Sequence, residues 1–233
     1  LKTVASLRSG ETVLIHTATG GLGLAAIAYA QAVGAVVYAT AGHPHKRRYL
    51  ASLGIKHIYD SRSLNFVEQV LNDTDQQGVD VVLNTLTGPG FVKGSLSVCA
   101  QEARFVELSK RDIWTAENVA QLRSDIDYQI VPLDQLVKND PQWGGELLKE
   151  VVSFIDENDI TPCPYVTYPI EQSPQALTYL QQAQHIGKVI VTLGEHAGVS
   201  PIGVIQSEGT YVVTGGLSGI GYELCHELIR QRA

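Results

Sequence analysis

The residues of this 233-residue chain that are best suited to chemistry form a glycine turn, GGLG at positions 20–23. The turn follows residues 12–16, an apolar run typical of a buried strand, and opens an alanine-rich stretch that predicts a helix over 22–33. Glycines at such a junction let the backbone approach a pyrophosphate, and the free N–H groups at the start of the helix bind its charge. The spacing predicts a dinucleotide site. Ala18 stands where the G-x-G-x-x-G pattern would begin, however, and a glycine turn can also be only a tight connection.

A cluster of cations follows the next predicted strand, residues 35–40. In a site for NAD, an acidic residue about 20 positions beyond the glycines binds the ribose 2′-hydroxyl, but no Asp or Glu lies between Glu11 and Asp60. The strand ends instead in TAGHPHKRR, which contains Lys46, and Arg62 follows a third predicted strand, 56–60. Because cations attract a 2′-phosphate and a carboxylate would repel it, the pattern favours NADP(H) over NAD(H). The alternative is a solvated start of the helix predicted over 46–53, where cations would oppose the helix dipole.

Polar residues also follow two later predicted strands, 79–84 and 103–108. Ligands of open α/β sheets bind outside the carboxyl ends of the strands, so residues 84–88 and 109–112 should lie near a nicotinamide ring. Lys110 and Asp112 are of types that donate a proton or orient a substrate, and a polar turn before a helix is the alternative. A further strand is predicted within 125–133, with Asp134 at its tip.

The elements that position these residues alternate between strands and helices. Further helices are predicted over 64–72, 91–100 and 142–156, and residues 1–8 resemble the end of a helix. This order predicts an α/β fold, a Rossmann-type doubly wound parallel sheet. From residue 161 the chain becomes proline-rich and extended, and a helix over 173–184 and a strand over 188–193 follow. We interpret this strand–helix–strand stretch as a return segment that packs on a second lobe, which is mostly absent.

A second strand and glycine turn, TYVVTGGLSGIG, begins at residue 210. A complete sheet needs no further first strand, so a second nucleotide-binding domain is expected to start there. The predicted units are the NADP(H)-binding domain over 1–160, the return segment over 161–194, a linker over 195–209 and the first βα unit of the next domain over 210–233.

Composition excludes several classes of protein. The net charge of −7 gives no basic footprint for nucleic acid, and no apolar run is long enough to span a membrane. The three scattered cysteines lack the spacing of a metal site or a disulfide framework, so we expect reduced thiols, no metal and a cytoplasmic location. The absence of Met predicts that the sequence is a piece of a longer protein.

Five stretches together resemble the enoyl reductase domains of modular polyketide synthases and animal-type fatty acid synthases, which are zinc-free members of the medium-chain dehydrogenase/reductase superfamily. They are HTATGGLGLAAIAYAQAVGA, KRRYLASLG, GVDVVLNTLTG, RFVELSKRDI and QQAQHIGKVIVTL, and the resemblance covers residues 1–193. TYVVTGGLSGIGYEL resembles the opening of the ketoreductase domain that follows enoyl reductase in such synthases.

The resemblance implies a reaction, its partners and its residues. NADPH would deliver hydride to the β-carbon of an enoyl thioester carried on the phosphopantetheine arm of an acyl carrier protein, beside ketoreductase and dehydratase domains. Lys110 and Asp134 match the family's proton-donor groups, although Ser109 replaces the usual glycine. Together with the positions argued above, the predicted cofactor-binding residues are Thr19, Gly20, Gly21, Leu22, Gly23, Thr40, Lys46, Arg62, Asn84, Leu86 and Ser109.

Three alternatives stay open at this point. The family's substrate lobe, which would precede Leu1, is missing from the sequence, so the chain could be a catalytically idle cofactor-binding remnant. A free-standing zinc-free quinone oxidoreductase shares the cofactor lobe, although it would not continue into TYVVTGGLSGIG. Some related domains close a cyclopropane ring after hydride transfer rather than reduce an alkene.

Overall fold

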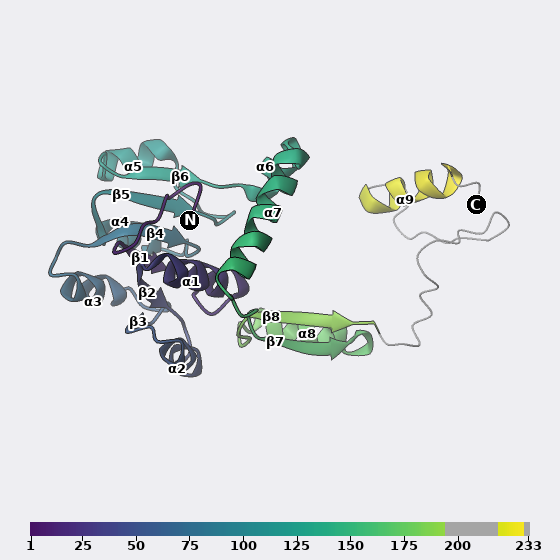
Figure 1. Ribbon diagram of the computed structural model, residues 1–233, viewed down its shortest axis with the longest axis horizontal. Coiled ribbons are helices and arrows are strands. Elements are labelled where there is room, and N and C mark those ends of the chain that lie inside the picture. Colours follow the sequence, from purple (N-terminus) through teal and green to yellow (C-terminus); the bar gives the residue numbers. More distant parts are fainter. Residues whose placement is uncertain (194–218, 231–233) are drawn as a thin grey trace.

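A six-stranded, all-parallel sheet is the centre of the computed structural model, which describes residues 1–193 and 219–230 (Figure 1). Its strands lie in the order β3-β2-β1-β4-β5-β6, which is the order of the Rossmann fold. The predicted fold class is therefore confirmed. The strands are β1 Thr12–Ile15, β2 Val36–Thr40, β3 His57–Tyr59, β4 Val79–Asn84, β5 Cys99–Glu107 and β6 Asp127–Ile130.

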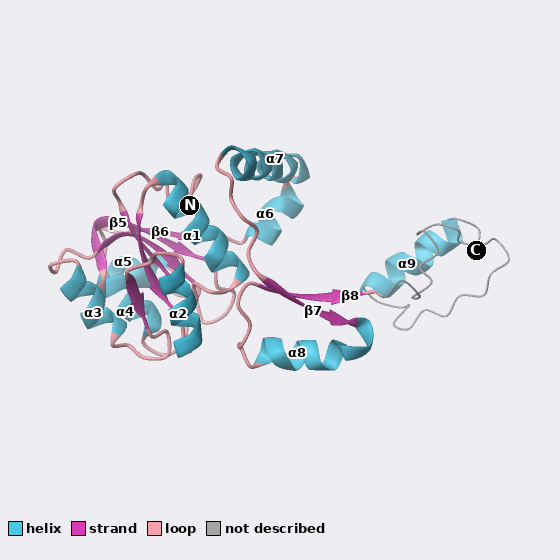
Figure 2. Ribbon diagram, turned by 60° about the horizontal axis from the view of Figure 1, so that its bottom comes forward, coloured by secondary structure: helices cyan, strands magenta, loops and turns pink. Residues whose placement is uncertain are grey.

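Helices cover both faces of this sheet, and the strands are apolar along most of their length for that reason. In β1, Val13 and Ile15 pack in one core cluster with α1 and α2, whereas Leu14 packs in the other with α3, α4 and α5. This alternation follows from the two-residue period of a strand. Figure 2 shows the magenta strands between these cyan helices. The helices are α1 Gly21–Val33, α2 Pro44–Ser52, α3 Phe66–Asp73, α4 Phe91–Ser97 and α5 Ala116–Leu122.

Two helices follow β6, namely α6 Leu133–Asn139 and α7 Pro141–Glu157. Helix α7 returns to α1, where the rings of Phe154 and Tyr29 lie 5.1 Å apart. The start of the chain was predicted wrongly, because residues 1–8 form turns and extended chain rather than the end of a helix. Ala5 and Leu7 are both buried, and this spacing of two, with Ser6 in the left-handed region, is incompatible with one face of a helix.

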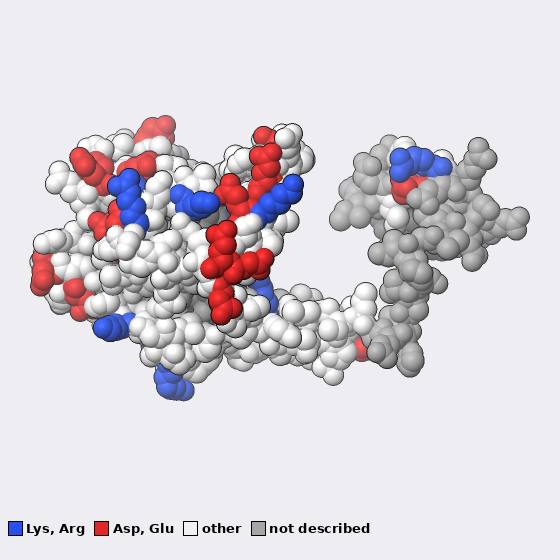
Figure 3. All heavy atoms as spheres, viewed as in Figure 1, with Lys and Arg blue, Asp and Glu red and all other residues white. Residues whose placement is uncertain are grey.

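The return segment folds as predicted, in the order strand, helix, strand. It consists of β7 Tyr165–Pro169, a 3₁₀ turn at Ile170–Gln172, α8 Ser173–Gln181 and β8 Lys188–Thr192, and its two strands pair in parallel. Figure 1 shows it projecting away from the large sheet. The exposed fractions of Tyr165, Leu177 and Leu193 are 65%, 65% and 61%, and the face turned to the viewer in Figure 3 carries almost no charged side chains. Packing of this segment on another lobe stays a prediction.

The last described element is α9, Gly219–Arg230, in agreement with the helix predicted after the second glycine turn. The predicted linker over 195–209, the strand over 210–214 and the turn at 215–218 lie outside the described residues. Within residues 1–193 and 219–230, no helix combines the length and apolarity that crossing a membrane requires.

Candidate functional site

The glycine turn leaves the start of α1 open to a ligand. Gly20 precedes the helix in an extended conformation, no side chain caps the helix, and its first turn carries no acidic residue. A Cβ on Gly23 would lie 2.5 Å from Cα of Ala18, so only glycine allows the helix to begin this close to β1. The N–H groups of Gly21 to Gly23 therefore have neither a capping side chain nor an acidic residue in the same helical turn, which favours the binding of an anion.

The return segment reaches this turn, a contact that the sequence did not predict. The amide of Gly187 donates a hydrogen bond of 2.8 Å to the carbonyl oxygen of Thr19. The exposed Lys188 lies so close to Gly21 that a Cβ there would overlap its side chain. Nδ1 of His185 is buried without a hydrogen-bond partner among the described residues. Burial, followed by the charge of Lys46, lowers the pKa of His185. The imidazole of His185 is therefore close enough to Lys46, one of the cations that follow β2, for the two groups to interact electrostatically.

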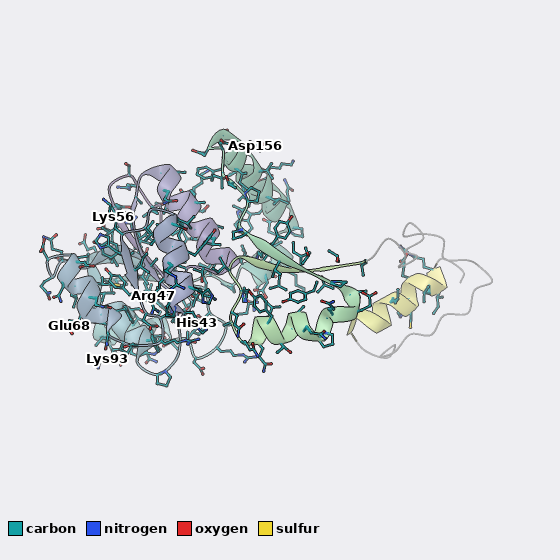
Figure 4. The ribbon with its side chains drawn as sticks, turned by 90° about the horizontal axis from the view of Figure 1, so that it is seen from below. His43, Arg47, Lys56, Glu68, Lys93 and Asp156 are labelled. Carbon is teal, nitrogen blue, oxygen red and sulfur yellow. The ribbon has the colours of Figure 1, made fainter. Side chains whose placement is uncertain are left out.

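The cations at the end of β2 form a cluster around the start of α2, where Figure 4 labels His43 and Arg47. Lys46 is only 8% exposed and forms no hydrogen bond or ion pair within the described ranges. Burial and the neighbouring Arg62 lower its pKa. Arg62 lies against the backbone of Gly42, and its guanidinium contacts His43 Nε2 at 2.6 Å. The guanidinium of Arg47 instead forms an ion pair of 3.2 Å with Asp60 Oδ2.

An unpaired, buried cation is costly unless an anion approaches it. Lys46 and Arg62, the two cations singled out from the sequence, have no carboxylate partner for their side chains in the described part of the chain, and neither does Arg48, but only Lys46 is buried. The arrangement fits a phosphate group, and the same surroundings would be unfavourable for a purely structural lysine.

Side-chain hydrogen bonds link the carboxyl ends of β1 and β2 to helix α4. The buried His16 contacts Thr40 Oγ1 through Nδ1 at 3.1 Å and Ser95 Oγ through Nε2 at 2.9 Å. Because Ser95 already donates to Phe91, it accepts from Nε2–H, and we infer that Nδ1 accepts from Thr40. Burial lowers the pKa of His16 to about 3, so the ring is neutral at pH 7. Thr40 therefore supports the turn from beneath, through His16 and through the Thr17 amide at 3.2 Å.

The carboxyl ends of β4 and β5 are linked by Asn84 and Glu107, both fully buried. Asn84 Nδ2 donates to Glu107 Oε2 at 2.6 Å, and the Ser109 amide donates to Glu107 Oε1 at 2.8 Å. Asn84 also brackets Leu86, since it accepts from the Leu86 amide and donates to the Leu86 carbonyl, both at 3.2 Å. Oγ of Ser109 is buried and has no partner among residues 1–193 and 219–230. The segments that begin at residues 85 and 108 are thus tied together below the surface.

Lys110 and Asp134 meet at the same edge. Lys110 Nζ lies 2.7 Å from Asp134 Oδ2, with side-chain exposures of 70% and 60%. Their hydrogen bond lowers the pKa of Asp134. Asp134 lies in the first turn of α6 rather than at the tip of β6, which ends four residues earlier at Ile130. The ion pair therefore holds the ammonium of Lys110 at the solvent-facing edge.

The structure therefore gathers the predicted site residues at one edge of the sheet. Sequence reasoning missed Glu107 and the contributions of the return segment. The sequence could have indicated Glu107, because it is an acidic residue inside the apolar predicted strand ARFVEL. No local sequence pattern indicates that His185 or Lys188 contributes to the site. Across the described residues, no group of three or more His, Cys, Asp or Glu could hold a metal ion.

The strand order, the open glycine turn and the unpaired cations define a dinucleotide-binding domain of the dehydrogenase type. Residues 53–191 match the family described as Zinc-binding dehydrogenase. The chain belongs to this family.

Comparison with individual proteins gives a narrower set of relatives. The chain is 40% identical over 237 residues to a Mycocerosic acid synthase-like polyketide synthase of Mycolicibacterium smegmatis, with 98% of this chain but 11% of that protein covered. The chain thus spans about a tenth of this relative's length.

Two solved structures are similar in both sequence and fold. The CurF ER cyclopropanase from the curacin A biosynthetic pathway is 35% identical with a TM-score of 0.81, over 83% of this chain and 58% of that one. The nucleotide-binding subdomain of the enoylreductase domain of PpsC from Mycobacterium tuberculosis is 36% identical with a TM-score of 0.62, over 68% of this chain and 89% of that one. Both come from enoyl reductase domains.

Proposed function

We propose that this chain is the cofactor-binding part of an NADPH-dependent enoyl reductase that works within a polyketide synthase. The observation that carries the proposal is the Lys110–Asp134 ion pair, which lies at the ligand edge of a fold similar to polyketide synthase enoyl reductases. The return segment would pack on the lobe that holds the substrate, and its uncharged, exposed face supports this role.

The residues present fit a nicotinamide dinucleotide with a 2′-phosphate. Gly20 to Gly23 offer uncapped N–H groups to the pyrophosphate, and Thr19 and Leu22 frame that turn. Lys46 and Arg62 would bind the 2′-phosphate, a double negative charge that matches their missing partners. Leu86 and Ser109 would line the nicotinamide end, at the edges of β4 and β5. When bound, NADPH supplies the hydride.

The task left to the protein is to manage charge on the thioester and to supply a proton to the α-carbon. Lys110 would perform it, since its ammonium can stabilise negative charge on the thioester oxygen and can act as a general acid. Asp134 would hold that ammonium in place through the 2.7 Å hydrogen bond. The thioester would arrive on the phosphopantetheine arm of an acyl carrier protein, next to ketoreductase and dehydratase domains in the cytoplasm.

The test uses the full-length protein that contains this chain. It is incubated with NADPH and an enoyl thioester on an acyl carrier protein, and the product is identified by mass spectrometry. The expected result is NADPH-dependent formation of the saturated thioester. No reaction in the presence of bound NADPH would support the idle remnant instead, and reduction of free quinones but not of the thioester would support the quinone oxidoreductase.

The similarity to a cyclopropanase supports a second candidate reaction. In ring closure the carbanion at the α-carbon attacks the γ-carbon, which requires a leaving group there. A thioester that carries such a group separates the two reactions, because reduction keeps the group and protonates the α-carbon, whereas ring closure expels it. Lys110 would donate no proton to carbon in the second case.

A further inference from the structure

Glu107 is an acid in a place where packing alone would favour an apolar residue. It ends β5, it is fully buried, and it forms no ion pair with any cation of the described ranges. Burying a carboxyl group is costly unless its oxygens are satisfied. Each oxygen has one donor, the Asn84 amide at 2.6 Å and the Ser109 backbone at 2.8 Å. The position of these two donors therefore depends directly on the carboxyl group.

Each donor belongs to a segment of the proposed site. Asn84 and Glu107 lie directly opposite each other in the β4–β5 register, and each is the last residue of its strand. The bond to Glu107 fixes the side-chain amide of Asn84, and this amide forms hydrogen bonds with both the N–H and the carbonyl of Leu86. The position of Leu86 therefore depends on Glu107 through Asn84. On the other side, the Ser109 amide fixes the backbone one residue before Lys110. A continuous path of hydrogen bonds thus joins Leu86 to the base of Lys110.

We propose that Glu107 is a positioning residue that sets the distance between the Leu86 segment and Lys110, and thereby between the nicotinamide and the proton donor. This rests on the proposed function. Lys110 is then held at both ends, its backbone by Glu107 through Ser109 and its ammonium by Asp134. Proton delivery and hydride delivery act on adjacent carbons, so a shift of this distance lowers the rate even when both groups are present.

The first experiment needs no ligand. Glu107→Gln keeps an acceptor for the Ser109 amide but turns an NH₂ group toward Asn84 Nδ2, so that two donors face each other. If Asn84 rotates to relieve this, its hydrogen bond with the Leu86 amide breaks. We expect hydrogen exchange of the Leu86 amide to rise about tenfold, the factor that corresponds to one lost hydrogen bond. Glu107 forms no hydrogen bond with Leu86 in the described part of the chain, so this change requires the path through Asn84.

The second experiment restores the path. Asn84→Asp combined with Glu107→Gln reverses donor and acceptor between the two side chains, because the new NH₂ group donates to the new carboxylate. That carboxylate still accepts from the Leu86 amide, although the Leu86 carbonyl loses the donor that Asn84 provides. Protection of that amide should return. The matched control is Asp80→Asn, the same change of carboxylate to amide near the other end of β4. Asp80 uses a single oxygen to accept from Thr12, so the amide keeps these bonds and the Leu86 exchange rate should stay unchanged.

The third measurement is turnover in the full-length protein. Glu107→Gln should lower kcat by about 10- to 100-fold while the KM for the thioester changes little, and the double variant should regain most of the loss.

Unchanged Leu86 exchange in Glu107→Gln, or a double variant no better than the single one, would overturn the proposal. A third outcome is that Glu107→Gln raises the Leu86 exchange rate as expected while the wild-type protein has no enoyl reductase activity. This outcome would reject the proposed function but not the role of Glu107, since the exchange measurement does not depend on activity. If Glu107→Gln does not fold, the exchange rate of the Ser109 amide in Asn84→Asp gives the corresponding test, because two carboxylates then face each other and Asn84 forms no hydrogen bond with Ser109 in the described part of the chain.

Discussion

The amide of Gly187 lies 2.8 Å from the carbonyl oxygen of Thr19, and this hydrogen bond ties the return segment to the glycine turn. Gly187 immediately precedes β8, and Thr19 immediately precedes the turn that opens α1. Lys188 then extends across Gly21. Any movement of the β7–β8 unit therefore acts directly on the backbone that is proposed to bind the pyrophosphate.

Substitution of Gly187 should weaken the dinucleotide site from outside the large sheet. Gly187 has a φ of +73°, and a Cβ there would overlap the carbonyl oxygen of Pro164. Gly187→Ala should therefore displace β8 and with it the Thr19 carbonyl, and NADPH affinity measured by titration should fall. Gly54→Ala is the control, because Gly54 has a φ of +81° with nothing within 4 Å of its Cβ position. Both variants carry a left-handed penalty of about 1–2 kcal/mol, but only the first should lose affinity. Equal affinities in the two variants would show that the contact does not support the turn.

Cofactor choice should depend on Lys46 and Arg62. Each is expected to form a charged hydrogen bond with the 2′-phosphate, and losing one costs about 1.5–3 kcal/mol, or roughly tenfold to a hundredfold in affinity. Lys46→Ala and Arg62→Ala should each weaken NADPH binding by this factor and leave NADH binding nearly unchanged. Arg47→Ala should have a much smaller effect, because Arg47 already pairs with Asp60 at 3.2 Å. Equal affinity of the wild-type chain for NADPH and NADH would contradict the assignment.

Stability should decrease in mild acid because of His16. Burial lowers its pKa to about 3 in the folded chain, below its usual value of about 6.5 in the unfolded chain. Between these pH values the unfolded state binds a proton that the folded state excludes, so the free energy of unfolding falls as the pH falls, by up to about 1.4 kcal/mol per pH unit. Urea unfolding at pH 7 and pH 5 should show this loss in the wild type. His16→Gln should reduce it by about 2 kcal/mol relative to the wild type, whereas the control His45→Gln, at an exposed position, should not. The same pH dependence in His16→Gln would show that another group is responsible.

The parts of the fold that the sequence predicted are those in which local pattern and tertiary burial agree. Residues 79–84 are predicted and observed as a strand, because a β-branched run between polar turns has one stable place, inside the sheet. Residues 1–8 were misjudged because their side chains fill gaps in the core from an irregular backbone, which leaves no periodic pattern.

For the site, the sequence identified residue types but not contacts. The cations beyond β2 were visible because no acidic residue accompanies them, and Lys110 because it follows a strand. That Arg47 is neutralised and Lys46 is not depends on the position of Asp60, which only the fold sets. The influence of Lys46 on His185 joins residues 139 positions apart, so no local rule could indicate it.

Lys110 should contribute to turnover rather than to cofactor binding. General acid help is worth roughly 10²–10⁴-fold in rate, so Lys110→Ala in the full-length protein should lower turnover within that range. NADPH affinity should barely change, because the side chain points to Asp134 rather than to the cations beyond β2. Asp134→Ala should lower turnover in the same direction, since it frees the ammonium. Lys138→Ala, at an exposed lysine on the same helix as Asp134, is the control and should have no effect.

A measurement independent of activity separates this role from a structural one. The hydrogen bond from Lys110 lowers the pKa of Asp134, so Lys110→Ala should raise that pKa toward the usual value for aspartate, and NMR titration of the carboxyl group can follow it. If the pKa rises and turnover falls, the pair acts as proposed. A raised pKa with normal turnover would leave the pair as a surface ion pair and transfer proton delivery to water. Normal turnover with weakened NADPH binding would place Lys110 among the cofactor ligands.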